Sequence, residues 1–82
     1  MQGPALYYYP TCPYCIKVLS FMKKNNLAIP LKNIHEDPRY GHELIKIGGS
    51  RQVPCLVIDG KALYESDDII AWLNNNPDRL KA

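Results

Sequence analysis

Residues 5–15 read ALYYYPTCPYC, an apolar and aromatic run followed by a proline and by two cysteines with two residues between them. The aromatic run favours a β-strand over residues 5–9, and the proline after it ends that strand. From Pro13 onward apolar side chains recur at helical spacing, and a proline suits the first helical turn because no N–H group is needed there. The sequence therefore predicts a strand, a short junction and a helix, with Cys12 at the helix N-terminus and Cys15 one turn inside.

Turn and capping signals divide the rest of the chain. We expect the first helix to end at Asn25-Asn26, then a strand over 27–34, a helix over 38–48 capped by Asp37, strands over 55–58 and 62–64, and a last helix that residues 74–77 end. Pro30 indicates an edge position for the second strand, because a proline donates no hydrogen bond to a neighbouring strand. Asp59-Gly60 is a typical hairpin signal. Ser66 is predicted to cap the last helix, with Asp67 and Asp68 in its first turn, where the helix dipole favours acidic side chains.

The predicted order of elements is β-α-β-α-β-β-α, which places the chain in the α/β class. The first strand, helix and strand form a βαβ unit, whose strands we expect to run parallel with a right-handed crossover. The last two strands form a hairpin. With 82 residues, of which 46% are hydrophobic and 22% charged, the composition predicts one globular domain spanning residues 1–82.

Charge and hydropathy exclude several classes of function. The net charge is +2 and the longest basic run is the pair Lys23-Lys24, so we expect no nucleic-acid binding. No stretch is long and apolar enough to cross a membrane, and the N-terminus lacks the pattern of a signal peptide. These observations predict a cytoplasmic monomer without membrane association.

The spacing of Cys12 and Cys15 suits dithiol redox chemistry. Such a site needs two thiols that can form a disulfide, and one of them must be a thiolate at working pH. The free N–H groups and the dipole at a helix N-terminus stabilise a negative sulfur at Cys12. Cys15, one turn further in, is expected to be shielded and protonated. The prediction is that Cys12 attacks and Cys15 resolves the mixed disulfide.

The alternatives for the cysteines are a metal site and a structural disulfide. A zinc site would need two further ligands, and Cys55 with His35 or His42 would supply them only if folding happened to bring them together. We therefore expect no metal, and both histidines are predicted to lie at the surface. A disulfide within the motif would close a very small loop and add little stability. Cys55 lies in a predicted core strand, where a buried hydrophobic role is favoured over a redox role.

Three segments together resemble the glutaredoxin family: Pro10-Thr11-Cys12-Pro13-Tyr14-Cys15, Val53-Pro54 and Ser66-Asp67-Asp68. Glu65-Ser66, following a Val-Pro strand, also resembles the N-terminal domain of glutathione transferases. The resemblance implies a thioredoxin fold, a four-stranded mixed sheet with three flanking helices. It also implies a cis peptide bond before Pro54.

The resemblance implies a glutathione-disulfide oxidoreductase, which reduces protein–glutathione mixed disulfides and protein disulfides with glutathione as co-substrate. The residues it implies for glutathione binding are Tyr14, Arg51, Val53, Pro54, Ser66 and Asp67. The Val53 backbone would pair with the cysteinyl part of glutathione as an added strand does. The N–H groups of Ser66 and Asp67 would bind the γ-glutamyl carboxylate, and the Asp67 side chain the ammonium. Taken alone, Val53-Pro54 also fits the start of a strand, and Ser66-Asp67 an ordinary helix cap.

The sequence departs from the family pattern at three places. Many glutaredoxins carry a lysine where this chain has Tyr9, and Arg51, Arg39 or Lys17 are candidates to supply that charge to the glycine carboxylate of glutathione. Gln52 replaces a common threonine. Tyr64-Glu65 occupies the position of a usual Gly-Gly pair.

Two other functions remain possible on the sequence. One is a carrier of an iron–sulfur cluster that Cys12 and glutathione ligate across a dimer, which Pro13-Tyr14 disfavours. The other is thioredoxin-like reduction served by a reductase, against which the Ser66-Asp67 element argues.

Overall fold

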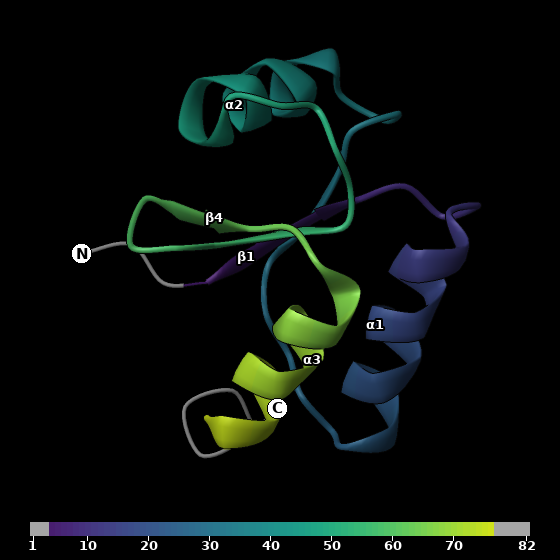
Figure 1. Cartoon of the computed structure of the whole chain (residues 1–82). Coiled ribbons are helices and arrows are strands. Elements are labelled where there is room, and N and C mark those ends of the chain that lie inside the picture. The colour runs from purple at the N-terminus through teal and green to yellow at the C-terminus, as the bar shows by residue number, and fades with distance from the viewer. Residues whose placement is uncertain (1–3, 77–82) are drawn as a thin grey trace.

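The computed structural model describes residues 4–76 (Figure 1). Its elements are β1 (Ala5–Tyr8), α1 (Pro13–Lys24), β2 (Leu31–Asn33), α2 (Pro38–Gly48), β3 (Cys55–Ile58), β4 (Lys61–Leu63) and α3 (Ser66–Asn75). The predicted order of elements is confirmed. Residues 1–3 and 77–82, among them the predicted helix-ending Pro77, lie outside the described residues.

The strands form one mixed sheet in the order β2-β1-β3-β4. β1 and β2 run parallel, β3 runs antiparallel to β1, and β4 runs antiparallel to β3. Figure 1 shows α2 on one face of this sheet, with α1 and α3 side by side on the other. The predicted edge position of β2 is confirmed.

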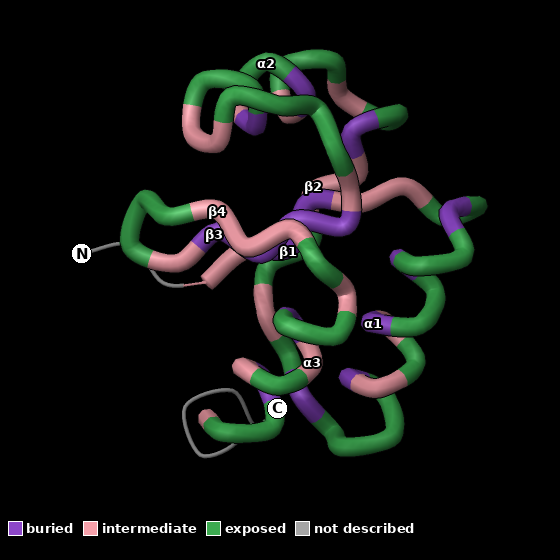
Figure 2. The backbone as a smooth tube through the Cα atoms, in the orientation of Figure 1, coloured by how far each residue is buried: buried purple, intermediate pink, exposed green. Residues whose placement is uncertain are grey.

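Each face of the sheet covers its own core, because neighbouring residues of a strand point to opposite sides. In β1, Leu6 packs on the α1 and α3 side and Tyr7 on the α2 side. Figure 2 shows buried residues in purple in the sheet and in the helices that pack on its two faces. The larger cluster comprises Leu6, Val18, Met22, Leu27, Leu56, Ile69 and Leu73, and the smaller one Tyr7, Ile34, Leu44, Cys55 and Val57.

The β3–β4 hairpin and the peptide bond before Pro54 are as predicted. Asp59 and Gly60 have φ angles of 51° and 80°, the two left-handed positions that a tight hairpin turn requires. The Val53–Pro54 peptide bond is cis. Both features lie at the ends of β3, and they fix where the chain enters and leaves that strand.

The predicted strands over 5–9 and 62–64 are each off by one residue, since β1 ends at Tyr8 and β4 is Lys61–Leu63. Two further predictions about boundaries are wrong. The second strand was expected over residues 27–34, but it is confined to Leu31–Asn33 because Pro30 has no N–H group to donate and contributes only its carbonyl, to Leu6 N at 2.9 Å. Ser66 was expected to cap α3, but the N-cap is Glu65, with φ −74° and ψ 129°, and no side chain caps the helix. Ser66 is already the first helical residue, so its hydroxyl does not face the free N–H groups of the first turn.

Among residues 4–76, no helix combines the length and the apolar character that crossing a membrane requires.

Candidate functional site

Cys12 is the N-cap of α1, and its backbone is extended, with φ −75° and ψ 121°. The Cys12 sulfur accepts a hydrogen bond from the Cys15 backbone N–H at 3.4 Å. The Cys12 N–H donates to the Tyr9 carbonyl at 3.3 Å, which closes the junction between β1 and the helix. Because Pro13 supplies no N–H group, the donors that remain at this helix end face the Cys12 sulfur.

The two motif cysteines have opposite acid–base properties. Burial acts to raise the pKa of the Cys12 thiol, but the N–H groups of Cys15 and Tyr14, the Cys15 thiol and the Tyr9 hydroxyl outweigh it and lower the pKa below its ordinary value. Burial raises the pKa of Cys15 to about 12. These directions agree with the prediction that Cys12 is the thiolate and Cys15 keeps its proton.

Cys55 lies apart from this pair, fully buried in the cluster under α2. Burial raises its pKa to about 11. A thiol that is inaccessible and protonated is a poor nucleophile. The structure therefore favours the packing role that the sequence indicates.

A cleft of about 260 Å³ lies beside the motif. It is lined by Tyr14, Gln52, Val53, Pro54, Tyr64, Glu65 and Ser66. Four of the residues expected to bind glutathione, Tyr14, Val53, Pro54 and Ser66, therefore meet in one place although they come from three separate segments. Gln52 and Tyr64 were noticed in the sequence only as departures from the glutaredoxin pattern, and Glu65 also as part of the resemblance to glutathione transferases; the structure places all three in the wall of this cleft.

Asp67 does not line this cleft. Its Oδ1 atom lies 2.5 Å from the Nζ atom of Lys17, which joins the N-terminal turn of α3 to α1. Both side chains are mostly exposed, so the pair contributes little to stability. The Asp67 side chain was predicted to bind the ammonium group of the γ-glutamyl residue. In this structure it binds an ammonium group, that of Lys17.

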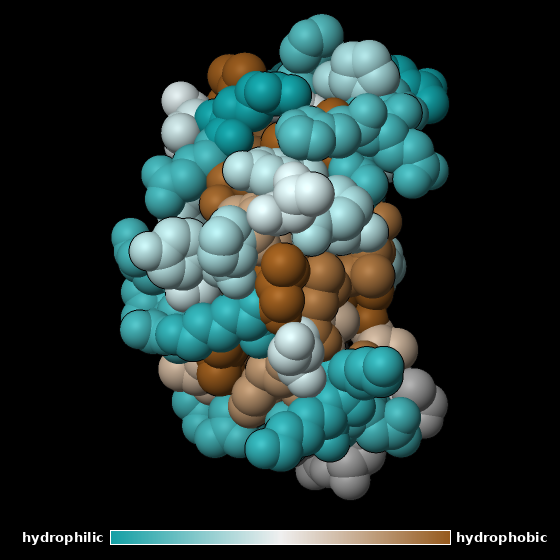
Figure 3. Space-filling model, turned by 90° about the vertical axis from the view of Figure 1, so that its right-hand side faces the viewer, coloured by the Kyte–Doolittle hydropathy of each residue, from teal (hydrophilic) through white to brown (hydrophobic). Residues whose placement is uncertain are grey.

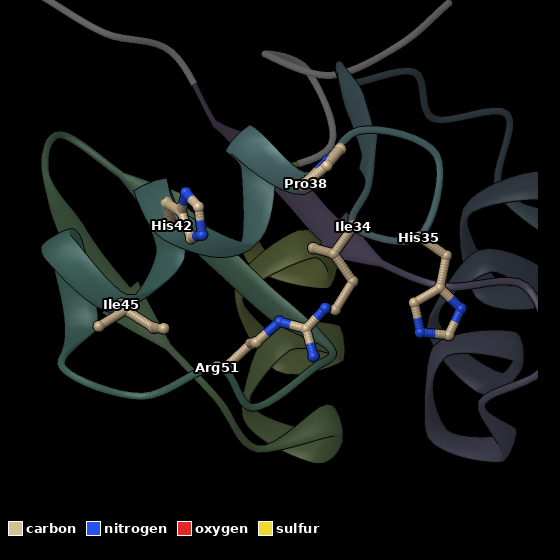
Figure 4. Close-up of a pocket in the computed structure, with 6 residues that line it drawn as sticks. All are labelled: Ile34, His35, Pro38, His42, Ile45 and Arg51. Carbon is tan, nitrogen blue, oxygen red and sulfur yellow. The ribbon is translucent and has the colours of Figure 1, made fainter.

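Arg51 faces a different pocket, of about 470 Å³ (Figure 4). It lines that pocket with Ile34, His35, Pro38, His42 and Ile45, and Figure 4 shows its guanidinium extending towards Ile34. Of the three cations proposed for the glycine carboxylate, Lys17 pairs with Asp67 and Arg39 with Asp37. Arg51 is the one without an ion pair among the described residues.

Tyr9 is the residue that sequence reasoning missed. Its carbonyl accepts a hydrogen bond from the Cys12 N–H at 3.3 Å, and its ring stacks on His35 with centroids 4.4 Å apart and planes 13° apart. His35 is exposed, as predicted, and its ring packs on a residue that is hydrogen-bonded to the Cys12 backbone. The signal in the sequence was the position itself, three residues before Cys12, where many glutaredoxins have a lysine.

Two large hydrophobic side chains at the motif are exposed. Tyr14 is 63% exposed and Ile16 is 48% exposed. Figure 3 shows a hydrophobic band on the face of the molecule that carries α1. Within residues 4–76, no group of three or more histidine, cysteine or acidic side chains is arranged to hold a metal ion.

Comparison with known proteins connects this site to two related groups. A family model that describes the glutathione S-transferase N-terminal domain matches residues 6–79. An uncharacterised glutaredoxin-like 8.6 kDa protein in the rubredoxin operon of Clostridium pasteurianum is 29% identical over 58 residues, which are 71% of this chain and 77% of that protein.

Solved structures of a glutathione transferase, a thioredoxin-like protein and a glutaredoxin share the fold of this chain. A Bombyx mori glutathione transferase superposes with a TM-score of 0.74 at 26% identity, covering 93% of this chain and 36% of the transferase. The thioredoxin-like protein BC3987 gives 0.73 at 29% identity, covering 89% and 97% of the two chains. A wheat glutaredoxin, 23% identical, shares the fold with a TM-score of 0.67 over 92% of this chain and 73% of its own. The chain thus spans about a third of the transferase, and the predicted thioredoxin fold is confirmed.

Proposed function

Because the chain belongs to the family of glutathione S-transferase N-terminal domains and is glutaredoxin-like, we propose that it is a glutathione-dependent thiol–disulfide oxidoreductase. The observation that carries the proposal is the pairing of two unlike thiols. Cys12 has a lowered pKa at the N-terminus of α1, and Cys15, whose N–H group contacts the Cys12 sulfur at 3.4 Å, has a raised one.

The first half-reaction is the reduction of a protein–glutathione mixed disulfide. The Cys12 thiolate attacks the glutathione sulfur, the bond between that sulfur and the protein sulfur breaks, and the protein thiolate leaves and takes a proton from water. A mixed disulfide between Cys12 and glutathione remains. The thiolate of a second glutathione then attacks the glutathione sulfur of this intermediate, which yields glutathione disulfide and restores the Cys12 thiolate.

Protein disulfides need the second cysteine. Cys12 attacks one sulfur of the substrate and releases the other as a thiolate. Cys15 then loses its proton and attacks the Cys12 sulfur, which releases the reduced substrate and forms a Cys12–Cys15 disulfide. Two glutathione molecules reduce this disulfide to the two thiols through a Cys12–glutathione mixed disulfide and leave as glutathione disulfide. The raised pKa of Cys15 keeps it from attacking before the Cys12 thiolate is consumed.

The cleft beside the motif is the site we propose for glutathione. The Val53 backbone presents an N–H and a C=O to the cysteinyl part of the tripeptide, as an edge strand does. The N–H groups of Ser66 and Asp67 bind the γ-glutamyl carboxylate at the N-terminus of α3. The Asp67 carboxylate exchanges Lys17 for the γ-glutamyl ammonium.

The experiment is a coupled assay in which a small glutathione mixed disulfide is reduced by glutathione and glutathione disulfide is recycled by glutathione reductase. We expect turnover that saturates with glutathione. Replacing glutathione and its reductase by a thioredoxin reductase should give none. Turnover with thioredoxin reductase alone would contradict the proposal and favour a thioredoxin-like protein.

A further inference from the structure

The pocket of about 470 Å³ that Arg51 lines lies between α2 and the segment that follows β2. It adjoins the proposed glutathione cleft, because the next residue, Gln52, lines that cleft. On another side His35 lines the pocket and stacks on Tyr9, whose carbonyl accepts the Cys12 N–H at 3.3 Å. The pocket therefore borders both the cleft and the junction that carries the reactive cysteine.

The Arg51 side chain lies against α2 at a glycine. Gly41 is a buried position of that helix, and a Cβ atom there would lie only 2.8 Å from the Arg51 Nε atom. Because position 41 has no side chain, the arginine fits against the helix, and Figure 4 shows its guanidinium reaching towards Ile34. The guanidinium is therefore part of the pocket wall, although the residue is exposed.

The lining of this pocket suits a carboxylate. Arg51 has no ion pair among the described residues, whereas Arg39 of α2 pairs with Asp37 at 2.7 Å. Of the described residues that line the pocket none is acidic, and His35 and His42 add imidazole donors. A guanidinium binds a carboxylate through two parallel hydrogen bonds. The remaining lining residues are apolar and suit the methylene groups of an acidic side chain: Ile34, Pro38 and Ile45.

The position of the pocket favours a polypeptide as its occupant. A free anion binds weakly to an exposed cation, because the ion pair contributes little free energy. The same ion pair has a larger effect when the anion belongs to a chain whose sulfur is bound to Cys12, since this attachment raises the local concentration of the anion.

We propose that this pocket binds a glutamate or aspartate side chain of the protein substrate, and that Arg51 determines this specificity. The inference rests on the proposed function, because the acidic side chain belongs to the protein whose disulfide Cys12 attacks. The substrate class is therefore proteins with an acidic residue near the cysteine that is reduced.

The test uses peptides with a single cysteine that is joined to glutathione in a mixed disulfide. One series carries a glutamate at successive positions on either side of the cysteine, and the matched series carries glutamine. At the best position we expect the kcat/KM for the glutamate peptide to exceed that for the glutamine peptide by about twofold to fivefold, the range of an exposed ion pair. Equal values at every position would overturn the proposal.

Three variants assign the preference to the pocket. Arg51→Gln should abolish it. Gly41→Ala should reduce it at unchanged net charge, because the new Cβ atom displaces the flexible arginine while alanine favours the helix. Lys46→Gln is the matched control, since it removes one positive charge from an exposed position of α2 outside the pocket lining, and it should keep the preference. A preference that survives in Arg51→Gln, or that Lys46→Gln reduces equally, would contradict the proposal.

Two further outcomes would assign Arg51 another ligand and overturn the proposal. One is a raised KM for glutathione in Arg51→Gln, measured with a small mixed disulfide, together with an unchanged peptide preference. The guanidinium would then bind the glycine carboxylate of glutathione. The other is an NMR response of the pocket amides to sodium phosphate alone, with equal responses to both peptides, which would indicate a site for simple anions.

Binding without turnover separates this inference from the proposed reaction. Peptides with serine in place of cysteine are titrated into the isotope-labelled protein, and NMR shifts are followed at the backbone amides of His35, His42 and Arg51. If the glutamate peptide shifts them more than the glutamine peptide while the coupled assay shows no glutathione-dependent turnover, the reaction fails and the pocket stands. If turnover is present and both peptides act alike, only the inference about the pocket fails.

Discussion

Cys12 and Cys15 are three positions apart, yet their thiols face different surroundings. Both residues are buried, Cys12 at 4% exposure and Cys15 at 0%, but the Cys12 sulfur accepts a hydrogen bond from an N–H group at the start of α1. Hydrogen bonds from N–H groups stabilise a thiolate at Cys12, whereas burial disfavours one at Cys15. The division of roles between nucleophile and resolving cysteine is therefore a consequence of where a helix begins.

The contact between Lys17 and Asp67 gives a prediction for glutathione affinity. Lys17→Ala frees the carboxylate that we assign to the γ-glutamyl ammonium, so the KM for glutathione should fall by about twofold to fivefold, the range of an exposed ion pair. Asp67→Asn should raise it. Steady-state assays over a range of glutathione concentrations measure both.

Lys23→Ala is the control, because Lys23 is another lysine of α1, in its last turn. The KM of this variant for glutathione should equal that of the parent. A KM that stays the same in both the Lys17 and the Asp67 variants would remove Asp67 from the glutathione site.

How far the site could be predicted differs from residue to residue. The roles of Cys12 and Cys15 follow from local sequence, because helix position sets their acidity. The Lys17–Asp67 pair joins residues 50 positions apart, and the stack of Tyr9 on His35 depends on the pairing of β1 with β2. No local pattern contains either contact. Arg51 was expected at the glutathione site, and the structure places it in the neighbouring pocket beside His35 and His42.

At the scale of the elements, α2 and β4 are fitted closely to each other. Gly48, the last residue of α2, leaves room for the Tyr64 hydroxyl, which donates to the Ser50 carbonyl at 3.4 Å. Tyr64 also lines the cleft next to Val53 and Pro54. Tyr64, in the segment after β4, therefore contacts the end of α2 and also forms part of the cleft wall.

Gly48→Ala tests this fit. A Cβ atom at position 48 would overlap the Tyr64 hydroxyl and lie 2.9 Å from the Ala62 Cβ atom. We expect a loss of about 1–3 kcal/mol in the free energy of unfolding, the usual effect of overpacking, although alanine is the better helix former. Urea denaturation measures it, and adding Tyr64→Phe should recover part of the loss.

Lys46→Ala, at an exposed position of the same helix, should leave the free energy of unfolding nearly unchanged. A Gly48→Ala variant as stable as the parent would show that α2 and β4 are packed less tightly than described.

The order of the elements could be predicted because each carries its own local signals, from Pro13 at the start of α1 to Asp59-Gly60 in the hairpin. The boundaries that were predicted wrongly depend on contacts with other segments of the chain. β2 starts only where Leu31 can pair with Leu6 of β1. The start of α3 is set by the extended backbone of Glu65 after β4, which outweighs the capping preference of Ser66.

At the scale of the whole molecule, the site lies where three segments converge. The start of α1 supplies the cysteines and Tyr14, the loop before β3 supplies Val53 and Pro54, and the segment from β4 into α3 supplies Ser66. The sheet order β2-β1-β3-β4 brings these segments together. Folding and the acidity of Cys12 are consequently coupled.

That coupling predicts a pH dependence of stability. The pKa of Cys12 is lowered in the folded state, so between that value and the ordinary value of 9.0 the unfolded chain binds more protons and stability rises with pH. The contribution is fully present above the ordinary value and is lost as pH falls through the folded-state pKa. Buried Cys15 and Cys55 act in the opposite direction only above pH 9.0, because their pKa values are raised.

Urea denaturation of the reduced protein at several pH values below 9.0, compared with Cys12→Ser, isolates this contribution. The parent should gain stability over the variant as the pH rises. Parallel stability curves would mean that folding does not favour the thiolate.

The most direct test of the proposed chemistry compares Cys12→Ser with Cys15→Ser on a glutathione mixed disulfide and on a protein disulfide. Cys12→Ser should be inactive on both substrates, because the pKa values of the other two thiols are raised. Cys15→Ser should retain turnover of the mixed disulfide, since glutathione alone releases Cys12, and should lose efficient reduction of the protein disulfide. A Cys15→Ser variant as inactive as Cys12→Ser on the mixed disulfide would contradict the account.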